Sequence, residues 1–566
     1  MKFLQYSSPH NTARSLKFSG LGCFLISLGL FIVLCDPIQM VVDHMLSLKP
    51  GTFLYRTWEK PPLDVYVKVY MFNVTNHERY VKGLDKKIKV EEIGPYVYQE
   101  YLTNNDAVFN DNDTVTFKPS RQVEFRREMS VGDPKVDMII APNIPYMGVT
   151  SAASDLSFLA AIAVRTLMRQ LDSKVMLKVS VHDYLWGVED HLVHLASKII
   201  PSVINFEKFG LLDRMFDEGY NTVTMNLPST KDKKDDDYNN EEKNEDRKSN
   251  DDYYFENYEP LVRDYSIDTW NGQKGMSKWG YKEGRVNTEC NTLRGTYDAT
   301  LFPRNITKGE TFRIYRKAFC RTLPIVYTHP GTVDGVDGYF FKLADNAFDS
   351  DINDPQSSCF CKDDICLKKG LGSITPCYYN IPLAVSFPHF YNSDPTLSHN
   401  IEGLSPSEEK HGTEIVIQPQ LGVPMKVHTR FQVNLLMGDI KFNNDLRPYK
   451  DTTLPVLWLE MNVESLNAEL LLLLQLLFNI CPYLQIVIVF VTICGGFATI
   501  AFSILLLIWS KKPIPPIIKD FDPKVELRRY SEIYLFPLLK RDLYRYTEEQ
   551  ERLTQHVENN AESSDS

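Results

Sequence analysis

Two long uncharged stretches stand out against an otherwise polar chain. Residues 18–35 carry no charge over eighteen positions, and residues 484–509 carry none over twenty-six. As helices rising about 1.5 Å per residue, both roughly match a hydrocarbon layer of about 30 Å. A cleaved signal peptide is the alternative for the first stretch, but its apolar run is too long and no small-x-small cleavage site follows it. We therefore predict two transmembrane helices.

Basic residues lie beyond the outer end of each predicted span, at Lys2, Arg14, Lys17, Lys511 and Lys512. Residues 451–483, before the second span, contain no lysine or arginine. Because basic residues favour the cytosolic side, we expect both tails, residues 1–17 and 510–566, to be cytosolic. Residues 36–483 would then form an extracellular or lumenal ectodomain. The sequons agree, because all of them fall inside it, at Asn73, Asn112 and Asn305, where we expect glycosylation.

Alternation of apolar and polar residues is the commonest pattern in the ectodomain. It is clearest in residues 423–435, where every second residue from Val423 to Leu435 is apolar or threonine. Residues 64–72 and 174–183 alternate in a similar way. A period of two predicts strands with one buried face. We therefore expect a mainly antiparallel sheet.

A helical pattern is strongest in residues 154–172, with Ser154 or Asp155 as the expected cap. Its apolar residues occupy more than one side of the helix: Leu156, Phe158, Leu159, Ile162, Ala163, Val164, Leu167 and Leu171. Such a helix is either deeply buried or a contact surface. A second helical patch is expected over residues 183–216. The apolar run 470–478 is interpreted as a helix on the bilayer or an oligomer contact.

The net charge of −11 disfavours nucleic acid as a partner, because phosphate binding uses clustered lysine and arginine. Much of the acidic excess lies in residues 230–259, which contain few aliphatic side chains. A segment of this composition cannot bury enough apolar surface to form a core. We interpret it as a solvated loop insertion.

Catalytic and cofactor motifs are absent from the sequence, which contains no G-x-S-x-G, no P-loop and no G-x-G-x-x-G. We expect neither an enzyme nor a bound cofactor. The densest group of metal-ligand types is His182, Glu189, Asp190, His191 and His194. Its histidines lack the order of a zinc enzyme, so surface or capping roles are predicted, with no metal bound.

Two further groups of polar residues are interpreted as structural. Residues 349–353 open like a calcium loop, but Asp354 stands where the sharp-turn glycine belongs, so we predict a turn. Lys426, His428 and Arg430 form a basic stripe on one strand face. A solvated face is the main interpretation of this stripe, and an anionic ligand is the alternative.

The ten cysteines fall into two groups. Four lie in or beside the predicted spans, and six crowd into the ectodomain: Cys290, Cys320, Cys359, Cys361, Cys366 and Cys377. An even set in an oxidising compartment predicts three disulfides, whereas the spacing matches no standard zinc finger. Their connectivity stays open, except that Cys359 and Cys361 would point the same way in an extended chain and so rarely bond each other.

A series of motifs resembles the class B scavenger receptors, the family of fatty-acid translocase, the lysosomal integral membrane protein type 2 and the insect sensory neuron membrane proteins. The motifs include EEIGPYVYQE, DYLWG, IDTWNG with SKWG, CFC, FPHFYNSDP, IEGLSPSEEKHGTEIVIQPQLG, RFQVNLL and LPVLWLE. In this order, between two terminal spans, they are highly specific. We expect an insect-type member of the family.

The resemblance implies an α+β fold, with a distorted antiparallel β-barrel-like ectodomain, an apical helical bundle and a lipid tunnel, flanked by two transmembrane helices. It implies the pairs Cys290 with Cys359, Cys320 with Cys377 and Cys361 with Cys366. It places residues 154–172 at the apex, so that ligand contacts are expected at Leu156, Phe158, Leu159, Ile162 and Lys174.

The expected function is uptake of hydrophobic cargo such as fatty acids, sterols or carotenoids, at the plasma membrane and also in endosomes or lysosomes. The expected partners are lipid or lipoprotein-type ligands, the membrane, protein or cell-surface ligands, and a second copy of the chain. A recognition receptor for apoptotic cells or microbes, or an endolysosomal cargo receptor, is the alternative. Residues Tyr530 to Ile533 match a tyrosine-based sorting signal.

Overall fold

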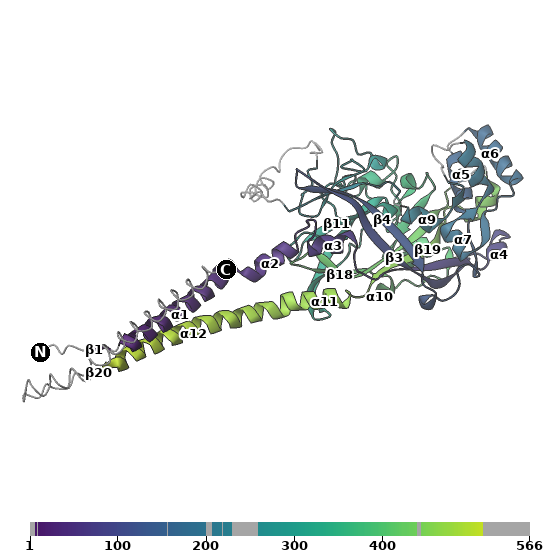
Figure 1. Ribbon diagram of the computed structural model, residues 1–566. Coiled ribbons are helices and arrows are strands. Elements are labelled where there is room, and N and C mark those ends of the chain that lie inside the picture. The colour runs from purple at the N-terminus through teal and green to yellow at the C-terminus, as the bar shows by residue number, and fades with distance from the viewer. Residues whose placement is uncertain are drawn as a thin grey trace, which may run out of the picture. The chain divides into compact units, whose positions relative to one another are not determined.

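The chain divides into two units, which are described separately. In the computed structural model the described residues are 6–7, 9–154, 157–199, 206–217, 219–228, 258–438 and 443–512. Residues 1–35 and 486–566 form the helix-pair unit, and residues 36–485 form the sheet unit. Figure 1 shows the long helices of the first and the strands of the second.

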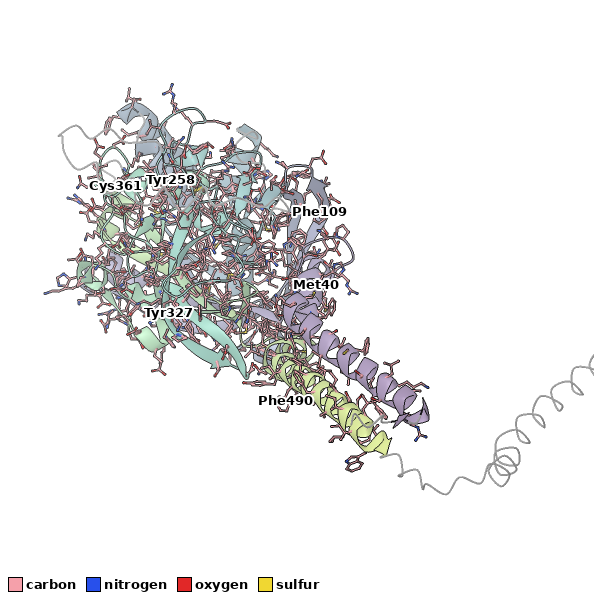
Figure 2. The ribbon with its side chains drawn as sticks, turned by 90° about the vertical axis from the view of Figure 1, so that its left-hand side faces the viewer. Met40, Phe109, Tyr258, Tyr327, Cys361 and Phe490 are labelled. Carbon is pink, nitrogen blue, oxygen red and sulfur yellow. A yellow bond between two sulfur atoms is a disulfide. The ribbon has the colours of Figure 1, made fainter. Side chains whose placement is uncertain are left out.

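The helix-pair unit contains α1 (Pro9–Cys35) and most of α12 (Cys481–Ser510), preceded by β1 (Tyr6–Ser7) and followed by β20 (Lys511–Lys512). Both helices are long and apolar enough to cross a membrane. Side chains such as Phe490 on α12 stay 67% exposed (Figure 2). The predicted pair of spans therefore matches the two helices in position.

Small residues let α1 and α12 approach closely. The hydroxyl oxygens of Ser15 and Ser503 are 2.7 Å apart, and Phe18 meets Phe502 edge to face. A side chain added at Gly22 would come within 2.5 Å of Ile500. Glycine at this position is therefore required by the packing of one helix on the other.

Fourteen strands form the main sheet of the sheet unit. Along the sheet they run β10 (Ile267–Trp270), β9 (Val223–Asn226), β4 (Thr114–Phe125), β3 (Ile88–Asn110), β2 (Val65–Val74), β19 (Thr453–Val463), β18 (Val423–Leu436), β17 (Glu414–Gln418), β13 (Val336–Leu343), β12 (Arg321–Val333) and β11 (Thr311–Arg316). Off this path lie β14 (Gly372–Ser373), β15 (Leu383–Ser386) and β16 (Ile401–Glu402). Successive neighbours on the path are antiparallel, as predicted.

The two ends of this strand order are joined by the backbone of residues 295–297. Gly295 N–H donates to the carbonyl of Ile267 on β10 at 2.9 Å, and Ile267 N–H donates to Thr296 at 2.6 Å. Tyr297 N–H donates to Arg313 on β11 at 2.8 Å. One short segment therefore hydrogen bonds to both edge strands of the sheet.

The strand predicted over residues 423–435 is β18, and the structure confirms it, but its burial changes along its length. The first half has one buried face, as the alternation predicts. In the second half Gln432 and Asn434, on the polar face, are fully buried as well. The reason is that β15 pairs with this half, where Asn434 donates to Ser386 at 2.9 Å.

The helices of the sheet unit gather at opposite ends (Figure 1). At one end lie α4 (His77–Val81), α5 (Ile144–Ser154), α6 (Phe158–Gln170) and α7 (Val181–Trp186); at the other lie α2 (Pro37–Met45), α3 (Phe53–Glu59) and α11 (Ala468–Gln475). The remaining helices are α8 (His191–Ile199), α9 (Leu211–Phe216) and α10 (Glu408–His411). Short strands near the first end are β5 (Met138–Pro142) with β6 (Met176–Ser180), and β7 (Val188–Glu189) with β8 (Lys208–Phe209).

Three sequence predictions about these segments need correction. The helix expected over 154–172 begins at Phe158, after α5 has ended at Ser154. The patch 183–216 is not one helix, because Gly187 adopts φ 152° after α7 and the chain then forms β7, α8, β8 and α9. The strand expected over 174–183 stops at Ser180, whose hydroxyl caps α7 by accepting from Asp183 N–H.

Three disulfides lie in the sheet unit. The structure joins Cys290 to Cys359, Cys320 to Cys377, and Cys361 to Cys366. These are the pairs that the family resemblance implies. Cys320 follows η4 (Lys317–Phe319), a short 3-10 helix between β11 and β12.

Candidate functional site

A large apolar cavity lies at the α3 and α11 end of the sheet unit. It encloses about 1490 Å³ not filled by protein atoms, with open solvent at its mouth included. We call it the basal cavity. Its walls come from α3, α11, β2, β3, β4, β11, β18 and β19 and the loops between them.

Two capped helices, α3 and α11, place leucine side chains in the wall of the basal cavity. Thr52 accepts from Tyr55 N–H at 3.3 Å and starts α3, which points Leu54 and Trp58 inward. Asn467 accepts from Leu470 N–H at 2.8 Å and starts α11. From there Leu470, Leu473, Leu474 and Leu477 follow an i, i+3, i+4, i+7 spacing, and all line the cavity. The sequence pattern thus sets one face of α11 against the hollow.

Charged side chains of the cavity wall cluster at its inner end. They are Glu100, Arg121 and Arg316. Arg121 forms a buried ion pair with Glu100, and Arg316 Nη2 lies 3.5 Å from the sulfur of Met461. The rest of the wall is uncharged, so a ligand here meets hydrocarbon along most of its length.

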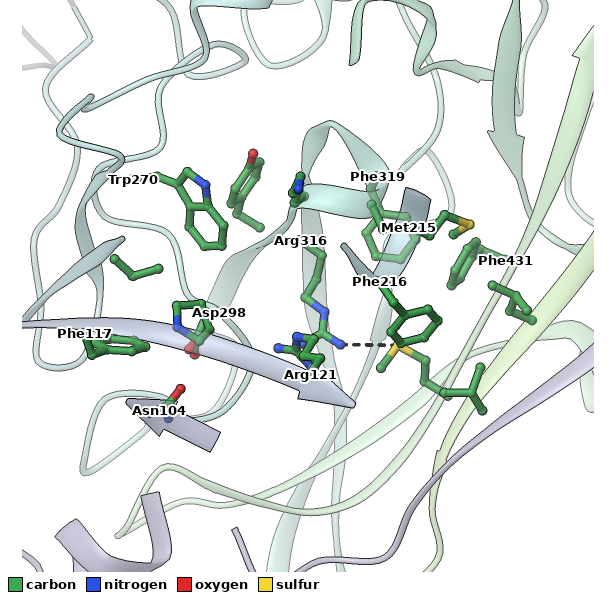
Figure 3. Close-up of a pocket in the computed structure, with 18 residues that line it drawn as sticks. Asn104, Phe117, Arg121, Met215, Phe216, Trp270, Asp298, Arg316, Phe319 and Phe431 are labelled. Atoms are coloured by element: carbon green, nitrogen blue, oxygen red, sulfur yellow. Dashed lines mark hydrogen bonds between the residues drawn. The ribbon is translucent and has the colours of Figure 1, made fainter. Parts of the chain in front are cut away.

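A smaller hollow, the inner cavity, lies beyond this charged end (Figure 3). Its space not filled by protein atoms is about 710 Å³, open solvent included, and it shares Arg121, Arg316, Phe319 and Met461 with the basal cavity. Figure 3 shows the two arginines between aromatic groups, with Phe117 and Trp270 on one side and Phe319 and Phe431 on the other. We call the four shared residues the collar.

The ligand contacts expected from the resemblance lie elsewhere. Phe158 and Leu159 on α6 are 70% and 78% exposed, and Ile162 is also exposed. Lys174, after α6, is exposed and lies 3.7 Å from Asp172. Leu156 lies outside the described residues. Deep burial of this helix is therefore wrong for its outer face, and a role in ligand contact stays a prediction.

The basic stripe on β18 faces carboxylates of its own chain. Lys426 lies 2.9 Å from Glu414, while His428 and Arg430 approach Glu460 to 3.1 and 2.7 Å. Burial raises the pKa of Glu460, but His428, Arg430 and Lys68 outweigh it and lower the pKa to about 2. The stripe is therefore partly exposed, and carboxylates of the same chain balance its charge.

Some of the polar groups expected to be structural make contacts within the chain. Asp190 caps α8 by accepting from Leu192 N–H at 2.7 Å, and Glu189 pairs with Lys208 at 2.8 Å. Asp351 accepts from Asn353 N–H at 2.9 Å in a turn. Across the described ranges, no three metal-ligating side chains converge on one point.

The predicted modification sites differ in access. Asn112 is exposed between β3 and β4, with its amide oxygen accepting from Thr114 at 2.7 Å, and Asn305 is exposed in a loop. Asn73 on β2 is half-buried, and its amide oxygen accepts from Ile140 N–H at 2.8 Å. Glycosylation at these positions stays a prediction. Tyr530, Ile533 and nearly all of the acidic insertion lie outside the described residues.

No sequence pattern indicates which residues line the basal cavity or form the collar. The signal for α11 was present, since residues 470–478 repeat leucine at helical spacing. That spacing does not say what lies opposite the leucines. Arg121 and Arg316 gave no signal, because they lie on strands at well-separated places in the sheet order and meet only in the folded chain.

Comparison with known proteins agrees with this architecture. A sequence model of the CD36 family matches residues 19–507. Scavenger receptor class B member 1 of Sus scrofa is 27% identical over 457 residues, covering 80% of this chain and 81% of that protein. Lysosome membrane protein 2 of Homo sapiens is 28% identical over 429 residues, covering 75% and 80%. The resemblance to class B scavenger receptors is confirmed, and the chain belongs to the CD36 family.

Proposed function

We propose that this protein is a membrane receptor that binds lipid cargo in the basal cavity and passes it to or from the membrane. The observation that carries the proposal is the wall of the basal cavity, which is apolar except at the inner end, where Glu100, Arg121 and Arg316 lie. Each methylene that leaves water gains about 0.8 kcal/mol. A chain of many carbons therefore partitions strongly into such a cavity without any chemical step. Fatty acids, sterols and carotenoids are the proposed cargo.

The barrel-like closure implied by the resemblance is part of this proposal. Strands from well-separated places in the sheet order, β4 and β11, line the same cavity. Residues 295–297 hydrogen bond to both edges of the sheet. Both observations support a sheet that curls around its hollow. A curled sheet keeps water away from a chain held inside it.

We further propose that residues 36–483 face the cell exterior or a lumen, with both tails in the cytosol. Three disulfides and the two exposed sequons, Asn112 and Asn305, support an oxidising, glycan-adding compartment. The plasma membrane is the proposed residence, with endosomes or lysosomes as a second site. The name of the relative lysosome membrane protein 2 supports the second.

Adjacent leucines of α11 provide a test. Leu473 lines the basal cavity, whereas Leu472 is 56% exposed on the other side of the helix. Full-length protein carrying Leu473→Glu should lose its co-purifying lipid, measured by mass spectrometry, because a carboxylate in the wall opposes an apolar chain. Leu472→Glu should retain it. Equal lipid content in the wild type and both variants, or none in the wild type, would overturn the proposal.

A second candidate function rests on α6. Its exposed residues Phe158 and Leu159 make an apolar surface suited to a protein or cell-surface ligand. Phe158→Ser with Leu159→Ser should abolish binding of apoptotic cells or microbes and leave the lipid content unchanged. Loss of lipid from the same variant would instead assign α6 to cargo capture.

A further inference from the structure

A solvent-open groove lies on the surface of the sheet unit. Its space not filled by protein atoms is about 1130 Å³, open solvent included. Its walls come from α9, the turn after β10, η3 (Ser277–Trp279) and the chain around η6 (Thr375–Cys377). We call it the side groove. Its lining is more polar than that of the basal cavity, so the side groove suits a ligand that is itself polar.

The walls of the side groove are held in place by bonds within the chain. Trp270 and Gln273 exchange backbone hydrogen bonds of 2.9 and 3.1 Å across a tight turn. The Cys320–Cys377 disulfide anchors two further walls, because Cys377 lines the groove and the indole N–H of Trp279 in η3 donates to the carbonyl of Cys320 at 2.6 Å. A groove with fixed walls loses little conformational entropy when a ligand binds.

Aromatic and amide side chains share the lining of the side groove. Trp270 lines it, and so does Tyr379, whose side chain is 36% exposed. Three amides line it as well, at Asn221, Asn271 and Gln273. Asn271 Nδ2 donates to Asn221 Oδ1 at 2.9 Å, and Gln273 is exposed on the same turn. A sugar ring has C–H faces that pack on aromatic rings and hydroxyls that amides bind, so this combination matches a sugar.

The side groove carries positive charge, although the whole chain has a net charge of −11. Lys278 is exposed on its wall, and Lys317 donates to the backbone carbonyl of Asp217. Within the described part of the chain neither lysine forms an ion pair. The carboxylate of Asp217 lies 3.6 Å from Arg214, so the acid of the wall is already paired. Two ammonium groups are therefore left to bond sulfate or carboxylate groups of a ligand.

We propose that the side groove binds an acidic glycan, a chain of sugars that carry sulfate or carboxylate groups. A sugar ring packs on Tyr379, its hydroxyls bond to Gln273, and its acidic groups bond to Lys278 and Lys317. An anionic membrane or a phosphorylated protein supplies the charge without the sugar ring, so the aromatic and amide groups favour the glycan. This site goes beyond the proposed lipid function and does not depend on it.

Removal of charge tests the acidic part of the ligand. In full-length, detergent-solubilised protein, Lys278→Gln with Lys317→Gln should weaken the binding of a heparin octasaccharide about tenfold. The matched control, Lys135→Gln with Lys178→Gln, removes the same charge from exposed lysines outside the groove lining and should retain the wild-type affinity. Equal loss in the two double variants, or no heparin binding by the wild type, would overturn the proposal.

A pair of probes tests the sugar ring. Tyr379→Ala should weaken heparin binding about fivefold and leave the binding of polyglutamate unchanged, because only the sugar loses an aromatic contact. Tyr379→Phe keeps the ring and should regain most of the heparin affinity. Equal loss of both probes in Tyr379→Ala, or displacement of heparin by phosphatidylserine vesicles, would overturn the glycan as the ligand. Co-purifying lipid should be the same in all these variants, which separates this site from the basal cavity.

Discussion

Two helices of the sheet unit, α6 and α11, have similarly apolar sequences and opposite surroundings. On α6, Phe158 and Leu159 are 70% and 78% exposed; on α11, Leu474 is 3% exposed and lines the basal cavity. Both patterns predict a contact surface. The difference shows that an apolar face indicates contact without telling whether its partner is a packed core, a hollow or another molecule.

The neighbours of each helix explain the contrast. The inner face of α6 is covered by α5, where Thr150 approaches Met168 at 3.9 Å, and its outer face has no further element of the described chain over it. Asn467 caps the start of α11, which then runs beside β18, β19 and α3. The side chains of these elements do not fill the space between them. The space between them is the basal cavity.

The largest expected effect separates the two helices directly. Leu474→Asp puts a carboxylate into an apolar wall and should lower the free energy of unfolding by about 5 kcal/mol. Leu159→Asp on α6 should change it by no more than about 0.5 kcal/mol. Thermal unfolding of the detergent-solubilised protein measures both. Similar losses for the two variants would break the comparison.

Cys320 directly follows Phe319 of the collar, whereas α6 carries no disulfide, so removal of the Cys320–Cys377 bond should act on the cavity side. Cys320→Ser with Cys377→Ser opens a loop of 57 residues next to Phe319 and should cost about 4 kcal/mol. Cys361→Ser with Cys366→Ser opens a loop of 5 and should cost about 2 kcal/mol. Denaturation curves under non-reducing conditions give the two losses in the free energy of unfolding. A larger loss for the shorter loop would contradict the explanation that a disulfide stabilises by reducing the entropy of the unfolded chain.

His411, a buried histidine at the end of α10, tests whether this part of the sheet unit excludes water, unlike the exposed face of α6. Burial, reinforced by the ring of His389 at 4.4 Å, lowers the pKa of His411 to about 4, against 6.5 for a free histidine. Between pH 6.5 and pH 4, His411 is protonated in the unfolded chain and neutral in the folded chain. The free energy of unfolding therefore falls as the pH is lowered from 6.5 to 4. The expected loss is about 3 kcal/mol.

His411→Asn provides the control for this pH dependence. His411 Nδ1 accepts from Ser407 N–H at 3.0 Å, and an asparagine oxygen can replace that acceptor without titrating. The variant should flatten the stability profile between pH 6.5 and 4. An unchanged profile would assign the acid response to other groups.

The smallest expected effect concerns the helix-pair unit, where facing and exposed positions differ again. At Gly22 an added side chain would meet Ile500 at 2.5 Å, whereas at Gly20 nothing lies within 4 Å. Gly22→Leu should weaken the contact of α1 with α12 by about 2 kcal/mol, and Gly20→Leu should not. Cross-linking of Ser15→Cys with Ser503→Cys reports the contact. Equal yields in both backgrounds would contradict it.

Much of the architecture could be predicted from the sequence. The uncharged runs gave both long helices, and the alternation over residues 64–72 and 423–435 gave β2 and β18. These succeeded because each depends on a local period. The helix predicted over residues 154–172 is longer than α6, which runs from Phe158 to Gln170.

By itself the sequence determined which side chains point together: the leucines of α11, the alternating residues of β18 and an even set of ectodomain cysteines. Only the tertiary structure decided what those side chains meet. Arg121 and Arg316 lie on strands at separate places in the sheet order, and residues 295–297 join its two edges. A cavity is a volume that no side chain fills. No single position encodes a cavity, because the cavity depends on how segments that are distant in the sequence pack around a space without filling it.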